Sequence, residues 1–254
     1  MTLGPAPTGS TVTSSATAGP PAEPVTLGPA PTGSTVTSSD RTVSLVGAGP
    51  GDPDLVTLRA EALLAEAATV VADAGVVHLA AAFAPRATII VVPDRTPAVD
   101  ALLAAARDRQ STLVRLYTGD TWLHPAHGPE SSALRAAGIE YEAVAGVAVE
   151  VALPALAGIP VHVRQLAVAC TIADDGGAPP ATDPARTLVV AAPDLRAAAR
   201  SMAATGDPSL PAAAIEATGA TTRAPLGDLA DGAPERPGLV VTGAVVATRQ
   251  PVLR

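Results

Sequence analysis

From Val43 onward, short runs of β-branched residues alternate with alanine-rich stretches, and this alternation restricts the fold more than any other feature of the chain. In the first half, the runs predict strands at Val43–Val46, Thr69–Ala72, Thr88–Val92, Leu113–Tyr117 and Tyr141–Val144. The stretches 54–67 and 99–107 each place apolar residues on one helical face. Strands that alternate with helices are typical of βαβ units, so we predict an α/β fold with a mostly parallel sheet.

A second α/β half is predicted after an alanine-rich segment that ends in "LAGIP", where Gly158 can cap a helix and Pro160 prevents its continuation. Its strands are expected at Leu166–Ile172, Thr187–Ala191, Ala212–Glu216 and Gly238–Thr242, with a helix near Leu195–Ala204. We therefore expect two α/β domains, residues 41–145 and residues 146–254, which meet near residue 145.

The N-terminal segment differs in composition from the rest of the chain. "TLGPAPTGSTVTSS" occurs at residues 2–15 and again, unchanged, at residues 26–39. A tract of small, polar and proline residues buries too little apolar surface to offset its ordering entropy. We predict that residues 1–40 are a disordered tail.

Composition and charge exclude several classes of partner. The 16 basic residues are outnumbered by 24 acidic ones, and the net charge of -8 disfavours binding to nucleic acid. A single cysteine excludes an internal disulfide framework and favours a reducing, cytoplasmic location. The N-terminal sequence lacks the pattern of a signal peptide, and we expect no membrane partner.

The stretch "GAGPGDPD", which follows the first predicted strand, is a glycine-rich turn. Gly47 and Gly49 match the first two glycines of a dinucleotide fingerprint, and Asp73 lies where its ribose-binding acid would be. The third glycine position holds Asp52, which is also a good helix N-cap. The carboxylates of Asp52 and Asp54 would oppose a diphosphate. The turn therefore favours a ligand with a neutral or cationic adenosine-type end over NAD.

A second glycine turn follows the buried run in "LVRLYTGD". Gly119 and Asp120 come directly after this strand, at its carboxyl end, which is where open α/β sheets bind ligands. The first and fourth predicted strands thus each end in a glycine turn that carries an acid. Two such turns at one sheet edge suit a sulfonium nucleoside.

Five motifs occur in a fixed order: "VGAGPGDPDLVTLRAEALLAEA", "VVAD", "VRLYTGD", "GIEYEAVAGV" and "VALPALAGIPVHVR". Together they resemble the tetrapyrrole methylase family, S-adenosylmethionine-dependent enzymes of the sirohaem and cobalamin pathways, over about Val43 to Arg249. The block "PALAGIPV" with Arg164 most resembles the uroporphyrinogen III C-methyltransferases of this family.

The resemblance implies a two-domain class III methyltransferase fold with the S-adenosylmethionine cleft between the domains, in an enzyme that is usually a homodimer. The methyl group would pass to a tetrapyrrole carbon by direct displacement, helped by alignment and proton removal and without a metal. A precorrin methyltransferase is the nearest alternative. A catalytically degenerate relative that acts as a binding or regulatory protein is the alternative from another class.

The resemblance also assigns candidate site residues. The implied cofactor contacts are Gly49, Pro50, Gly51, Gly119, Asp120, Val147, Ala148 and Ala213. The implied catalytic residues are Glu130 and Asp73. For Asp73 two alternatives remain open: it orients the substrate, or it only terminates its strand.

The stretch "TGDTWLHPAHGPE" departs from the family pattern. Ala126 replaces an arginine thought to help handle the substrate, whereas Glu130 is retained. Ala148 and Val149 stand where the family has a Thr-Ser pair. These losses favour the degenerate relative, whereas the first turn and the Gly119-Asp120 pair favour the enzyme.

Two further features have alternative explanations. His124, His127 and Glu130 recur at a spacing of three and could bind Zn²⁺, but the prolines and Gly128 favour an irregular loop with exposed histidines. Cys170 alternates with apolar residues on a predicted strand, so we expect a buried cysteine.

Overall fold

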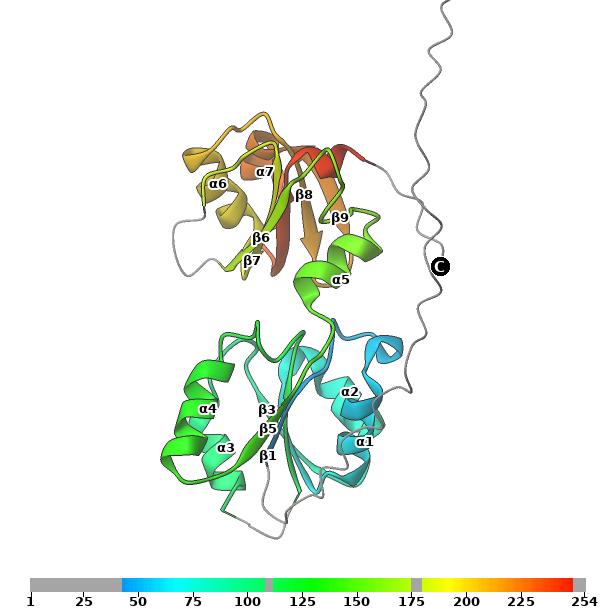
Figure 1. Cartoon of the computed structure of the whole chain (residues 1–254), viewed down its shortest axis with the longest axis vertical. Helices are drawn as coiled ribbons and strands as arrows, with labels where there is room; N and C mark the ends of the chain where they lie inside the picture. The colour runs from blue at the N-terminus through cyan, green and yellow to red at the C-terminus, as the bar shows by residue number, and fades with distance from the viewer. Residues whose placement is uncertain (1–42, 108–111, 175–179, 249–254) are drawn as a thin grey trace, which may run out of the picture. The chain divides into compact units, whose positions relative to one another are not determined.

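The computed structural model describes residues 43–107, 112–174 and 180–248, and these form two five-stranded sheets with helices (Figure 1). The predicted disordered tail, residues 1–40, lies outside the described residues. No helix of the described part is long and apolar enough to cross a membrane.

The first sheet is entirely parallel, in the order β3-β2-β4-β1-β5. Its strands are β1 (Val43–Gly47), β2 (Thr69–Asp73), β3 (Thr88–Val92), β4 (Leu113–Tyr117) and β5 (Tyr141–Val144). All five agree with the predicted strands to within one residue. This order makes β1 and β4, the two strands that precede the glycine turns, direct neighbours.

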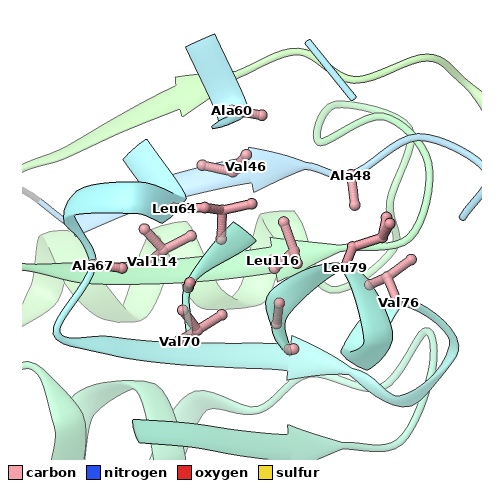
Figure 2. Packing of buried hydrophobic residues seen from close by; sticks show 13 residues of the cluster. Val46, Ala48, Ala60, Leu64, Ala67, Val70, Val76, Leu79, Val114 and Leu116 are labelled. Atoms are coloured by element: carbon pink, nitrogen blue, oxygen red, sulfur yellow. The ribbon is translucent and has the colours of Figure 1, made fainter. Parts of the chain in front are cut away.

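Helices cover both faces of the first sheet. They are α1 (Leu58–Glu66), α2 (Val77–Phe83), α3 (Val99–Ala105) and α4 (His127–Ala136). Leu64 of α1 and Leu79 of α2 pack with Val46, Val70 and Leu116 in a core on one face (Figure 2). The helices α3 and α4 bury the opposite face. Strands β1 and β4 are therefore buried along their whole length, as expected for a parallel sheet covered on both sides.

The second sheet has the order β6-β7-β10-β8-β9. Its strands are β6 (Ala169–Asp174), β7 (Arg186–Ala192), β8 (Pro211–Glu216), β9 (Thr221–Pro225) and β10 (Gly238–Thr242). Only β6 and β7 are parallel, and the other pairs are antiparallel. The prediction of a mostly parallel arrangement is wrong for this half, because alternating strands and helices do not specify strand direction. A short hairpin between β8 and β9 was missed.

The second sheet also has a core on each face. The helices α6 (Leu195–Thr205) and α7 (Leu226–Gly232) pack on one face. The helix α5 (Val149–Leu156) and the short helix Ala244–Ala247 pack on the other. Gly158 follows α5 with a φ of 68°, as predicted for a helix-terminating glycine.

Several elements differ from the predictions. The helices α2, α4 and α7 and the strand β9 were not predicted. The helix expected at 54–67 is divided into a short helix, Pro53–Leu55, and α1, whose N-cap is Thr57. The helix α4 was missed because Gly128 and Pro129 argued against a helix. Both lie in its first turn, where backbone amides have no acceptor within the helix, so the missing amide of proline costs no hydrogen bond.

Cys170 is exposed, so the prediction of a buried cysteine is wrong. It lies on β6, an edge strand of the second sheet. Val168 and Ile172, two residues away on either side, are 75% and 40% exposed. The alternation in the sequence is real, but the apolar side of this edge strand is largely left uncovered.

Three glycines bring three segments of backbone into contact at the carboxyl edge of the first sheet. A Cβ on Gly146 would lie 2.4 Å from the Gly119 oxygen and 2.7 Å from the Gly47 oxygen. A Cβ on Gly47 would lie 2.6 Å from the Gly119 oxygen. Backbone surrounds both positions, so neither has room for a side chain.

We expect Gly146→Ala to lower the free energy of unfolding by about 1–3 kcal/mol, because the added methyl group overpacks fixed backbone atoms. Gly128→Ala is the matched control, because its Cβ would meet nothing within 4 Å. Denaturant unfolding of both variants measures the difference. A Gly146→Ala variant as stable as the control would show that the three segments do not meet so closely.

Candidate functional site

The two glycine turns meet at the carboxyl edge of the first sheet, as predicted from the sequence. The Gly49 amide donates to the Gly119 oxygen at 3.1 Å, and the Gly119 amide donates to the Gly49 oxygen at 2.8 Å. The φ angles are 78° at Gly49 and 82° at Gly119, in the left-handed region that favours glycine. The parallel pairing of β1 and β4 holds these turns side by side.

The first turn exposes its carboxylates. The Asp52 carboxylate accepts from the Asp54 amide at 3.0 Å and caps the short helix that follows, as predicted. Asp52 and Asp54 are both exposed, and Pro50 and Gly51 are partly exposed. The imidazole of His78, on α2, contacts the Gly51 oxygen at 2.8 Å. The turn is thus anchored from α2 and keeps acidic groups at its surface.

The second turn is fastened to the segment that follows β5. The Asp120 carboxylate accepts from the amides of Trp122 at 2.9 Å and Gly146 at 3.0 Å. The Thr121 hydroxyl donates to the Val144 oxygen at 2.7 Å. Two predicted cofactor contacts, Val147 and Ala148, come directly after Gly146 in sequence. The structure therefore brings Gly49, Gly119, Asp120 and the 146–148 segment together.

Ala213 differs from the other predicted cofactor contacts. It lies in β8, in the interior of the second sheet, and is fully buried. Its neighbours in the core include Leu153 and Val241. Its assignment as a cofactor contact stays a prediction.

Arg115 of β4 forms the centre of a buried charge cluster with Asp73, Glu130, Tyr117 and His124. Its Nη2 lies 2.7 Å from Asp73 Oδ1 in an ion pair without ideal hydrogen-bond angles. Its Nε donates to Glu130 at 3.1 Å. The side chains of Arg115, Asp73 and Glu130 are all fully buried. The Tyr117 hydroxyl donates to Glu130 at 2.6 Å, and the Tyr117 ring lies 4.4 Å from the guanidinium carbon.

Asp73 links this buried charge cluster to the second turn. Its Oδ2 accepts from the Thr118 amide at 3.0 Å and lies 2.9 Å from Nε2 of His124. The His124 Nδ1 accepts from the Ala126 amide at 3.2 Å. Burial raises the pKa of Asp73, but contacts with His124, Arg115 and the Thr118 amide outweigh burial, and the pKa falls below its usual value. Asp73 is therefore ionised at neutral pH.

The two predicted catalytic carboxylates are thus brought together, but inside the protein. Asp73 holds the backbone of the second turn, and Glu130 also accepts from the Ala98 amide at 2.7 Å, at the start of α3. Neither carboxylate has an exposed surface. This geometry supports a positioning role for both, whereas their predicted catalytic role stays a prediction.

Sequence reasoning missed the parts played by Arg115, Tyr117 and His124. Arg115 did give a signal, because it interrupts the apolar run "LVRLY" of a strand that is otherwise buried. A charge in such a position needs an ionic partner. The sequence could not show which of the 24 acidic residues would supply it.

The alternative explanations for the two histidines are also resolved. His124 faces Asp73, Glu130 faces Arg115, and no group of three His, Cys, Asp or Glu within the described ranges could hold a metal ion. His124 and His127 are only 5% and 8% exposed, and α4 begins at His127. The prediction of an irregular loop with exposed histidines is therefore wrong, because the loop folds inward onto Asp73.

We expect Arg115→Met to lower the free energy of unfolding by about 3–5 kcal/mol, because it leaves two buried carboxylates without their cation. Arg59→Met is the matched control. Arg59 pairs with Glu142 at 3.0 Å, but its side chain is 50% exposed, so its loss should cost about 1 kcal/mol or less. Denaturant unfolding compares them, and equal losses would contradict the ion-pair assignment.

Comparisons with known proteins show which family and which solved structures the chain is similar to. A family model described as Tetrapyrrole (Corrin/Porphyrin) Methylases matches residues 42–230. The uroporphyrinogen-III C-methyltransferase of Synechocystis sp. is 37% identical over 137 residues, which cover 51% of this chain and 52% of that protein. The precorrin-4 C(11)-methyltransferase of Pseudomonas aeruginosa is 35% identical over 122 residues, which cover 46% and 48%. The chain spans about half the length of these curated relatives.

A solved structure matches over a longer range. It is the uroporphyrin-III C-methyl transferase from Thermus thermophilus complexed with S-adenyl homocysteine. The TM-score is 0.69 and the identity is 32%, with coverage of 81% of this chain and 98% of that chain.

Proposed function

Because this chain belongs to the tetrapyrrole (corrin/porphyrin) methylase family, we propose that it binds S-adenosylmethionine and transfers the methyl group to a tetrapyrrole carbon. Its fold is the α/β fold of the class III methyltransferases. The observation that carries the proposal is the meeting of the two glycine turns, Gly49 against Gly119, at the carboxyl edge of β1 and β4.

The residues at this edge fit a neutral or cationic ligand. The exposed carboxylates of Asp52 and Asp54 suit a sulfonium better than a diphosphate. The Thr118 hydroxyl, at the second turn, is buried without a hydrogen-bond partner, and a ligand could supply one. We propose that the 146–148 backbone and the carbonyl oxygens of Gly49 and Gly119, each of which can accept a second hydrogen bond, contribute most of the binding, because Ala148 has no hydroxyl. The remaining predicted contacts, at Pro50, Gly51, Asp120 and Ala213, are part of this proposal.

S-adenosylmethionine, when bound, would supply an electrophilic methyl group: the acceptor carbon would form a bond to this methyl as its bond to sulfur breaks, and S-adenosylhomocysteine would leave. The task of the protein is then to align donor and acceptor and to remove a proton from the product carbon. In this proposal, Asp73 and Glu130 are positioning residues. Asp73 fixes the Thr118 amide of the second turn, and Glu130 fixes Arg115.

Uroporphyrinogen III is the first acceptor to assay, because the Synechocystis relative bears its name. A precorrin is the second, because the Pseudomonas relative is named a precorrin-4 methyltransferase. The third alternative is a degenerate relative with a binding or regulatory role. It is favoured by Ala126, whose fully buried side chain cannot replace the arginine of the family, and by Ala148 and Val149.

We further propose that the protein is a cytoplasmic homodimer. Each subunit has two α/β domains with a boundary near residue 145. Support for a dimer comes from two exposed apolar residues, Val168 directly before β6 and Ile172 on β6. Val168→Asp should shift the sedimentation coefficient of the protein from dimer to monomer, because it places a charge on this edge. A wild-type protein that sediments as a monomer at all concentrations would contradict the proposal.

Calorimetric titration with S-adenosylhomocysteine tests the proposed cofactor site directly. A micromolar Kd, about -8 kcal/mol, is expected for the wild type. Gly119→Ala should weaken binding more than tenfold, because its Cβ would lie 2.8 Å from a Val149 methyl group and distort the turn. Gly138→Ala is the matched control. Gly138 also has a positive φ, 66°, but its Cβ would meet nothing within 4 Å.

The Gly138→Ala variant should bind S-adenosylhomocysteine as the wild type does. The absence of binding by the wild type would overturn the methyltransferase proposal. If Gly119→Ala and Gly138→Ala bind S-adenosylhomocysteine with equal affinity, the second turn is not part of the cofactor site.

A further inference from the structure

Aromatic residues are concentrated beside the second turn. The whole chain has four Phe, Trp and Tyr residues, and three of them surround His127. The ring centroids of Trp122 and His127 are 4.7 Å apart, and those of Tyr117 and Tyr141 lie 6.4 Å and 6.5 Å from His127. We call Trp122, Leu123 and His127, with the two tyrosines beneath them, the aromatic surface.

This aromatic surface is not simply part of the core. Trp122 is 64% exposed and Leu123 is 46% exposed, although both are large and apolar. The Asp120 carboxylate fixes the loop through the Trp122 amide, so Trp122 follows the second turn in a defined backbone conformation. Exposed apolar groups next to a ligand-binding edge are typical of a recognition surface.

The same region offers no cation to a carboxylated ligand. Residues 118–130 contain no Arg or Lys. Arg115, which precedes them, is fully buried and already neutralised by Asp73 and Glu130. Burial lowers the pKa of His127, and Glu130 raises it by less, so the net pKa is below its usual value and the imidazole is neutral at pH 7.

One polar atom of the aromatic surface lacks a partner. The Nδ1 of His127 is buried and makes no hydrogen bond within the described structure. Native proteins leave few such atoms without a hydrogen bond, and binding sites are among the exceptions. The region thus combines two exposed apolar side chains, Trp122 and Leu123, with a neutral imidazole.

We propose that the aromatic surface binds the acceptor through an apolar ring face, and that this acceptor carries fewer carboxylates than uroporphyrinogen III. The inference rests on the proposed function and narrows its substrate class. Contact with the exposed ring of Trp122 supplies the attraction. A carboxylate-rich ring would need cations that residues 118–130 do not supply.

Porphyrin binding tests the inference, with the full-length protein, in the presence and in the absence of excess S-adenosylhomocysteine. The probes are mesoporphyrin, a dicarboxylate, and uroporphyrin III, an octacarboxylate, and binding is measured by calorimetry. Fluorescence quenching of Trp122, the single tryptophan of the chain, gives a second readout for the wild type. We expect mesoporphyrin to bind the wild type at least tenfold more tightly than uroporphyrin.

Three variants test whether the aromatic surface causes the preference for mesoporphyrin over uroporphyrin. Trp122→Ala should weaken mesoporphyrin binding about threefold to tenfold, as expected for the loss of an aromatic contact. Leu123→Arg should strengthen uroporphyrin binding and make it sensitive to salt, because it adds an exposed cation. Val91→Ala is the matched control. Val91 is 54% exposed on β3, and its loss should change neither affinity.

The outcomes separate this inference from the proposed function. Tighter binding of uroporphyrin than of mesoporphyrin, binding of neither, or equal effects of Trp122→Ala and Val91→Ala would each overturn the inference. Calorimetry with S-adenosylhomocysteine reports separately on the cofactor site. If the protein shows the porphyrin preference but does not bind S-adenosylhomocysteine, the role of the aromatic surface is supported and the methyltransferase proposal is contradicted.

Discussion

The ion pairs of Arg115 hold together the parts of the first sheet on which the candidate site depends. One cation inside β4 forms ion pairs with Asp73 at the end of β2 and with Glu130 on α4. A buried charge without a partner costs several kcal/mol, so these three side chains can be buried only together. Asp73 is then available to accept from the Thr118 amide. The second glycine turn is therefore positioned by a contact that begins at a neighbouring strand.

Close backbone contact complements this electrostatic constraint. Gly47, Gly119 and Gly146 leave no space for side chains where β1, β4 and the segment after β5 meet. The Asp120 carboxylate and the Thr121 hydroxyl then fasten the turn to this segment. A site made largely of backbone groups can keep its shape although Ala148 and Val149 have replaced hydroxyl residues. This backbone framework supports the proposal that the chain binds S-adenosylmethionine despite these substitutions.

The loop that follows the second turn departs from the family pattern at several positions, among them Ala126. His124 faces Asp73 in the interior, and Ala126 is buried in place of an arginine. Trp122 and Leu123 remain exposed. The loop thus presents an exposed apolar surface without an arginine or lysine beside the buried charge cluster and the two turns. In the proposed function, this surface affects which acceptor is recognised more than whether the cofactor binds.

The sequence by itself determined the first sheet, the meeting of the two glycine turns and the family. Strand periodicity, Gly49, Gly119 and the Asp52 cap are local signals, and parallel strands place their carboxyl ends at one edge. Only the tertiary structure decided the antiparallel pairing of the second sheet, the exposure of Cys170 and the partners of Arg115. These depend on which strand lies at an edge and which of many acids approaches one cation. Both are contacts between residues distant in sequence, and periodicity and spacing do not encode them.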